Sequence, residues 1–81
     1  MNLEYQILNF KNEVINKGMC MITYLKKRKE FIEKIEMASK KISNFITILY
    51  YKDLISQQQY IDYKMKIADA RKKYKQMLSF Y

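Results

Sequence analysis

Apolar side chains recur at alternating spacings of three and four along the first fifty residues. The recurring positions are Leu3, Ile7, Phe10, Val14, Met21, Tyr24, Phe31, Ile35, Ala38, Ile42, Phe45 and Leu49. This repeat has the period of an amphipathic α-helix and is sustained over many turns. A second apolar stripe follows in a shifted register, through Tyr60, Tyr63, Ile67, Ala70, Tyr74, Met77 and Tyr81. One continuous helix would keep its register, so the shift predicts two helices whose stripes close against each other.

The break between them lies close to Ser56, which has the features of a helix N-cap. Gln59 follows at the spacing of a capping box, in which each side chain accepts a hydrogen bond from the other residue's backbone N–H. Ile55 and Tyr60 occupy the positions of a hydrophobic staple across the helix start. The link from Lys52 to Ser56 is short, and short links join antiparallel neighbours. The sequence therefore predicts an antiparallel helical hairpin that turns near residue 54.

Gly18 leaves two interpretations of the first fifty residues open. It could end a helix over residues 3–17 as a left-handed cap, or the undisturbed register could carry one long helix through it. The stretch from Met19 to Leu25 is apolar on nearly every side, and such a stretch must be covered from more than one direction. This favours a break near Gly18. We expect one all-α domain over residues 1–81, an antiparallel helical hairpin or three-helix bundle with coiled-coil-like packing and helices at about 3–17, 19–52 and 57–79.

The composition excludes several function classes. The chain contains one glycine, no proline, no histidine and one cysteine. Without histidine there is no histidine general base, no Ser–His or Cys–His pair and no histidine metal ligand. A single glycine cannot build a phosphate-binding loop or a dinucleotide fingerprint. We therefore expect no enzyme activity, no catalytic, cofactor-binding or metal-binding residues, and no cofactor.

The single cysteine, Cys20, cannot form an internal disulfide. It lies in an apolar run, so we expect it to be a small buried side chain rather than a reactive thiol. A lone thiol fits a reducing compartment, which predicts a cytoplasmic protein of a bacterial or phage-infected cell. Nowhere does the chain approach the ~18 consecutive apolar residues of a transmembrane helix, so we expect no membrane span.

The chain is short for an independently stable domain. A domain of this size buries only about 60% of the surface that its unfolded chain exposes. Neither a disulfide nor a metal set is present in the sequence to compensate. Self-association would add buried surface, so we expect a homodimer.

Positive charge is concentrated in two segments. The formal net charge is +8, of which residues 26–41 carry +4 and residues 63–81 carry +5, while residues 1–25 carry 0 and residues 42–62 carry −1. In a hairpin that turns near residue 54, both basic segments lie toward the end away from the turn. They could bind nucleic-acid phosphate or an acidic protein, or they could keep a small hydrophobic bundle soluble. The candidate anion-binding residues are Lys26, Lys27, Arg28, Lys29, Lys34, Arg71, Lys72, Lys73 and Lys75.

Tyr50, Tyr51 and Leu54 lie beside the turn, where core packing explains them less well. Tyrosine is enriched at protein interfaces, so these three residues are candidate protein contacts. The alternative is that they only cover the end of the bundle.

Residues 49–64 (Leu-Tyr-Tyr-Lys-Asp-Leu-Ile-Ser-Gln-Gln-Gln-Tyr-Ile-Asp-Tyr-Lys) resemble the SHOCT (short C-terminal) helical hairpin. That family typically has a leucine, a short polar link, Gly, Ile, Thr or Ser, three glutamates, an aromatic residue and then a basic helix. Ile55, Ser56 and Tyr60 match this pattern, whereas Leu54 replaces the usual glycine and Gln57–Gln59 replace the glutamates. The resemblance implies a role in oligomerisation or partner contact.

These features predict a non-catalytic protein-binding adaptor or inhibitor, encoded by a phage or other mobile element and acting as a dimer on a host or defence protein. A nucleic-acid-binding protein that uses the basic end is one alternative. A bacteriocin-immunity-type helical protein is another, because the size, basicity and helix count are similar, although no residue motif ties the chain to that family.

Overall fold

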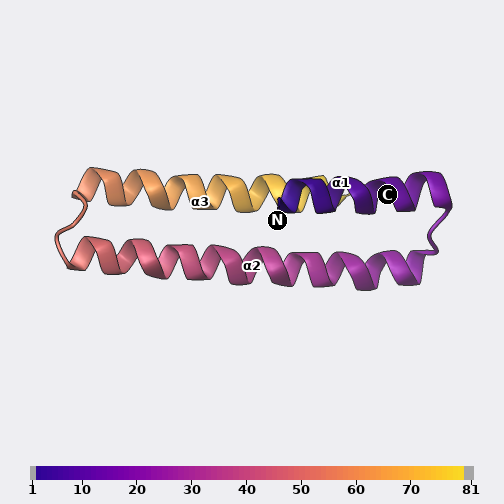
Figure 1. Ribbon diagram of the computed structural model, residues 1–81, viewed down its shortest axis with the longest axis horizontal. Coiled ribbons are helices and arrows are strands. Elements are labelled where there is room, and N and C mark those ends of the chain that lie inside the picture. Colours follow the sequence, from indigo (N-terminus) through magenta and orange to yellow (C-terminus); the bar gives the residue numbers. More distant parts are fainter. Residues whose placement is uncertain (1, 80–81) are drawn as a thin grey trace.

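The computed structural model describes residues 2–79, which form three α-helices. They are α1 (Leu3–Lys17), α2 (Met21–Tyr51) and α3 (Gln57–Met77). α2 and α3 pack side by side in antiparallel directions, and the two interhelical turns lie at opposite ends of the molecule (Figure 1). The molecule is elongated, with extents of 51 × 20 × 16 Å. The predicted all-α class, the hairpin and the break near Gly18 are confirmed.

Both ends of α1 are capped. The Asn2 side chain accepts a hydrogen bond of 2.9 Å from the Glu4 backbone N–H and so caps the start of α1. Gly18 ends α1 with φ = 70°, the left-handed conformation that favours glycine. The chain then remains extended at Cys20, so α2 begins at Met21 rather than at the expected residue 19.

Cys20 is exposed, and the prediction of a buried thiol was wrong. Cys20 is the N-cap residue of α2. The extended backbone at this position directs the side chain toward the first turn of α2 instead of toward the core. The Cys20 Sγ lies 3.1 Å from the Thr23 Oγ1. Hydrogen bonds from the Thr23 side chain and backbone stabilise the thiolate, which lowers the pKa of Cys20.

The turn between α2 and α3 combines a C-terminal cap of α2 with an N-terminal cap of α3. The Leu54 N–H donates to the Leu49 carbonyl at 2.9 Å and the Asp53 N–H donates to the Tyr50 carbonyl at 3.0 Å, the two hydrogen bonds of a Schellman motif. Asp53 takes the left-handed position, with φ = 57°. Ser56 and Gln59 form the predicted capping box, with distances of 3.1 Å and 2.9 Å.

The core lies at the end where all three helices meet. It contains the buried side chains Ile7, Phe10, Val14, Tyr24, Ile35 and Leu78. The Phe10 ring stacks between Tyr24 and Phe31, with centroid distances of 5.7 and 5.2 Å. The Tyr24 hydroxyl donates to the Leu78 carbonyl at 2.6 Å, which satisfies its buried polar atom and ties the end of α3 to α2.

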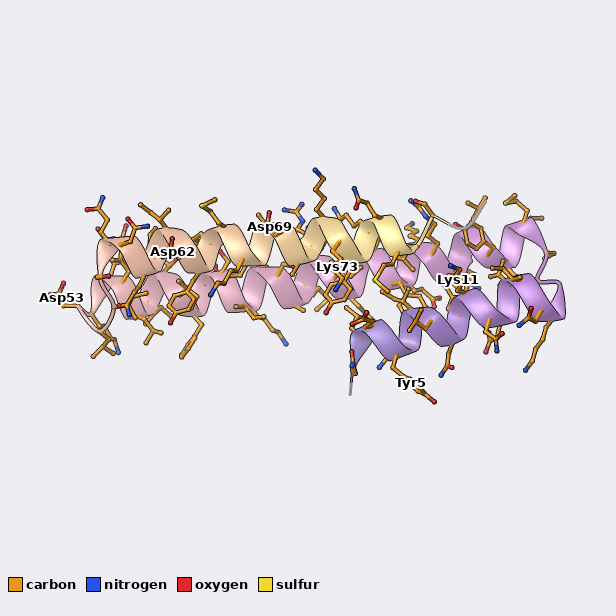
Figure 2. All side chains as sticks on the ribbon, turned by 90° about the horizontal axis from the view of Figure 1, so that it is seen from above. Tyr5, Lys11, Asp53, Asp62, Asp69 and Lys73 are labelled. Carbon is orange, nitrogen blue, oxygen red and sulfur yellow. The ribbon has the colours of Figure 1, made fainter. Side chains whose placement is uncertain are left out.

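Beyond this core, the apolar stripes are partly open to solvent. Figure 2 shows that α1 lies over only one half of the hairpin and that the turn with Asp53 is far from it. In the other half Ile46 is buried, whereas Ile42 and Phe45 are 52% and 59% exposed. No residue of α3 within Gln57–Met77 is buried. The predicted packing of α2 and α3 against each other is confirmed. Within residues 2–79, however, no third helix covers the half near the turn, so the outer parts of both stripes stay exposed there.

Candidate protein-binding surface

An apolar groove runs between α2 and α3, starting where α1 begins. Leu3 of α1 lies at one end of the groove, which has a volume of about 260 Å³. Phe45 stands one helical turn from Ile42 along α2 and extends the apolar surface beside the groove. We call this surface the open face; it consists of Ala38, Ile42, Phe45 and Ile46 from α2 and Tyr63, Ile67 and Ala70 from α3.

The open face follows from the lengths of the helices. α1 has 15 residues and α2 has 31, which correspond to about 22 and 46 Å at 1.5 Å per residue. Because α1 joins α2 through the turn at Gly18, at the end away from the hairpin tip, it can reach only about halfway along α2. The apolar period of α2 nevertheless continues to its end. Within residues 2–79, the second half of the stripe therefore packs against α3 but has no third helix over it.

The hairpin half that carries the open face is held together from its other side. The Lys64 ammonium donates to the Ser43 carbonyl at 3.1 Å, to the Thr47 hydroxyl at 2.9 Å and to the Ser43 hydroxyl. It also lies 5.3 Å from the centroid of the Tyr60 ring. Ser43 lies about 160° around α2 from Phe45 at 100° per residue. This polar network therefore joins α2 to α3 without covering the open face.

Tyr50, Tyr51 and Leu54 form the tip of the hairpin. Tyr50 is half-buried and stacks on Tyr60 with a centroid distance of 4.5 Å. Tyr51 and Leu54 are 79% and 66% exposed. The structure thus immobilises one of the three candidate contact residues and presents the other two to solvent at the end of the molecule.

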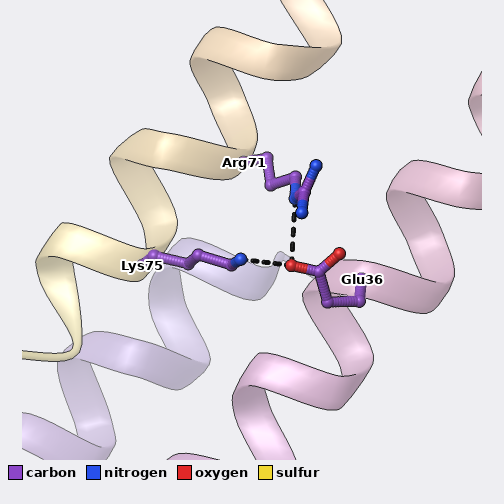
Figure 3. A network of polar contacts seen from close by, with 3 residues as sticks. All are labelled: Glu36, Arg71 and Lys75. Atoms are coloured by element: carbon purple, nitrogen blue, oxygen red, sulfur yellow. Dashed lines mark hydrogen bonds and ion pairs between the residues drawn. The ribbon is translucent and has the colours of Figure 1, made fainter.

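Four of the predicted anion-binding residues share one concave surface at the end of α3. Arg28 of α2 lines a hollow of about 460 Å³ together with Arg71, Lys72 and Lys75 of α3. Glu36 draws two of these cations toward α2, because its Oε1 accepts a hydrogen bond of 2.9 Å from the Arg71 Nε and pairs with the Lys75 ammonium (Figure 3). Both hydrogen bonds stabilise the charged carboxylate and so lower the pKa of Glu36, with Lys75 having the larger effect and Arg71 the smaller one.

The other predicted anion-binding residues lie on different faces. Lys27 pairs with Glu13 of α1 at 3.5 Å, and the Lys34 ammonium lies 5.5 Å from the Phe31 ring centroid. Both residues line a groove beside α1 rather than the hollow at α3. Lys26, Lys29 and Lys73 are exposed. The fold brings the two basic segments to one end of the molecule but distributes their side chains around it.

Sequence reasoning missed two interhelical contacts, those of Glu36 and Lys64. Glu36 of α2 pairs with Arg71 and Lys75 of α3. A simple signal existed. Glu36 and Arg71 stand seventeen residues before Asp53 and seventeen after Leu54, and Ser43 and Lys64 stand ten before and ten after the same pair. Equal distance from the turn identifies residues that face each other in an antiparallel hairpin.

The part of the chain that the structure describes contains no group of three or more Cys, Asp or Glu side chains that could hold a metal ion. Among residues 2–79, no helix combines the length and apolar character needed to cross a bilayer. Neither protein-family models nor curated proteins nor solved structures gave a match to this chain. The resemblance of residues 49–64 to a SHOCT hairpin therefore stays a prediction.

Proposed function

We propose that the protein is a non-catalytic protein-binding module, an adaptor or inhibitor, that contacts its partner through the open face and the tip of the hairpin. The observation that carries this proposal is the continuous apolar surface left bare beyond α1. Phe45, Ile42 and Tyr63 are 59%, 52% and 37% exposed around the groove. Contiguous exposed apolar surface on a small protein is typical of interaction sites.

The groove suits an apolar helix face or side-chain anchors. Two parallel ridges of α2 and α3 with apolar residues between them form the kind of channel that receives an amphipathic helix in other recognition systems. Tyr51 and Leu54 offer separate exposed apolar contacts at the tip of the hairpin. The interhelical contacts of Lys64 keep the two ridges at a fixed spacing without a partner, so the surface is preorganised and binding orders few groups.

Site-specific photocrosslinking in living cells tests this function. A photoreactive phenylalanine analogue would be placed singly at Phe45, at Tyr51 and, as a matched control, at Met65. Met65 is 59% exposed, like Phe45, but lies on the opposite side of α3 from Tyr63. We expect an adduct with another protein of defined mass at Phe45 or Tyr51 and none at Met65. Equal labelling at all three positions, or none at any of them, would contradict the proposal.

A second candidate function, nucleic-acid binding, is favoured by the hollow that brings Arg28 together with Arg71, Lys72 and Lys75. Phosphate contacts release counterions, so such binding weakens steeply with salt. Fluorescence anisotropy with duplex DNA and single-stranded RNA would compare Lys72→Glu with Lys52→Glu, which reverses an exposed charge at the tip. This function requires a larger loss for Lys72→Glu. Equal losses, or affinity that is indifferent to salt, would exclude it.

A further inference from the structure

We infer that a second copy of this chain covers the open face, turned end for end so that the uncovered halves of two hairpins form a four-helix bundle around a twofold axis. This inference rests on the proposed function of the open face as a protein-binding surface and names its partner. Each copy would present the same residues, Ile42, Phe45 and Tyr63 among them, to those of the other.

The shape of the protomer favours this arrangement. α1 covers the half of the hairpin away from the tip, and its first residue, Leu3, lies at the groove. A second hairpin laid on the open face continues the layer that α1 begins, with its tip next to the start of α1. Because the two copies are related by a twofold axis, the same fit is made twice. The exposed Leu54 at each tip then gains an apolar neighbour.

The distribution of charge selects the antiparallel orientation. The half near the turn is almost neutral, since residues 42–62 carry a net charge of −1, whereas residues 26–41 and 63–81 carry +4 and +5. Lys64 is held on the other side of the hairpin by Ser43 and Thr47, which leaves Lys66 as the lysine of this half that lines the groove. Overlap of the neutral halves places the two basic ends at opposite ends of the dimer, far beyond a Debye length of about 8 Å. A parallel dimer would bring them together.

The available area is sufficient for a specific but weak dimer. Half of the 51 Å length multiplied by the 20 Å width gives about 500 Å² per protomer, so the dimer would bury about 1,000 Å² in total, close to the lower limit for a biological interface. The exposed fractions of Phe45 and Ile42 show that this area includes large side chains. We therefore expect a reversible equilibrium between monomer and dimer.

Sedimentation equilibrium over a range of concentrations measures this association. Wild-type protein is expected to approach twice the 10.0 kDa mass of the chain, Phe45→Asp to remain monomeric, and Met65→Asp to dimerise like wild type. Phe45 and Met65 have the same 59% exposure, so neither substitution disturbs the core, and circular dichroism would verify equal helix content. A wild-type protein that stays monomeric, or a Phe45→Asp variant that still dimerises, overturns the inference.

Spin labels on the exposed native thiol of Cys20 test the orientation. Cys20 lies at the end of the protomer opposite the tip. In the antiparallel dimer the two labels are separated by more than the 51 Å length of one protomer, whereas in a parallel dimer they approach the 20 Å width. A shorter distance than 51 Å in double electron–electron resonance overturns the arrangement.

The two proposals fail in different ways. A monomeric protein that forms an adduct with another protein at Phe45 retains the proposed function and removes the second copy as partner. A dimer that forms adducts only with itself retains the second copy and removes the adaptor or inhibitor function.

Discussion

Truncating Phe10 to alanine tests whether α1 is held to the hairpin by the small core at the end where all three helices meet. Phe10 is 2% exposed, and its ring stacks on Tyr24 and Phe31. Besides Phe10, the buried residues of α1 are Ile7 and Val14. The substitution removes the largest of the three side chains and leaves a cavity between α1 and α2.

The expected loss is large relative to the total stability. Removing a buried phenylalanine side chain costs about 3–5 kcal/mol, and its aromatic contacts add to the burial of area. A chain of 81 residues has a total free energy of unfolding of about 4–12 kcal/mol. Phe10→Ala should therefore remove about a quarter or more of the total stability and weaken the attachment of α1 to the hairpin.

Urea denaturation and amide hydrogen exchange together measure this effect. Amides of residues 7–17 should lose protection first, while those of residues 43–50 and 60–67 retain more, since the Lys64 contacts hold that half independently. Leu8→Ala is the matched control, because Leu8 is 51% exposed on the same helix, and it should change stability by less than about 0.5 kcal/mol. A loss below about 1 kcal/mol for Phe10→Ala, or equal losses for both variants, would refute the proposed role of this core.

Three further predictions concern the turn, the interhelical network and pH. Gly18→Ala should lower the free energy of unfolding by about 1 kcal/mol in thermal denaturation. Nothing lies within 4 Å of the added Cβ, so the loss comes from the backbone angle φ = 70°, which strains an L-residue. Asparagine tolerates this conformation, so Gly18→Asn should lose less stability. Lys64→Met should cost about 1–2 kcal/mol in urea denaturation by leaving the Ser43 and Thr47 oxygens without their charged donor, and a loss no greater than that of Lys66→Met would contradict this. The lowered pKa of Glu36 means that its ion pairs stabilise the fold above the pKa of the unfolded state and cease to do so as the pH falls through the folded-state pKa. The stability difference between wild type and Glu36→Gln should therefore shrink on acidification, and a difference that is constant with pH would show that the carboxylate charge is unimportant.

Local signals in the sequence determine where this chain forms helices and where it turns. The capping box of Ser56 and Gln59 and the glycine at residue 18 act within a few residues of themselves, so their effects do not depend on the rest of the fold. Cys20 shows the limit of this local reading. Its apolar neighbours predicted burial, but its position at a helix N-cap directs the thiol to solvent.

The candidate surfaces were predictable in part. The neutral tip and the basic opposite end follow from the hairpin topology, and Tyr51 and Leu54 project from the tip. The sequence did not show that Lys34 and Arg71 face different grooves, because the orientation of a side chain around a helix becomes meaningful only when the neighbouring helices are in place. The expected stripe included Met77, which packs against the core, but it missed Leu78, which the structure buries completely in the same cluster.

The sequence alone determined the all-α class and the antiparallel hairpin and favoured a break near Gly18, since these depend on helix caps and apolar period. Only the tertiary structure decided which parts of the apolar stripes are buried. An apolar period indicates that one face of a helix must be buried, but it does not identify the element that buries it. α1 is too short to cover more than half of the hairpin. The open face around Ile42 and Phe45 is thus a property of the assembled helices.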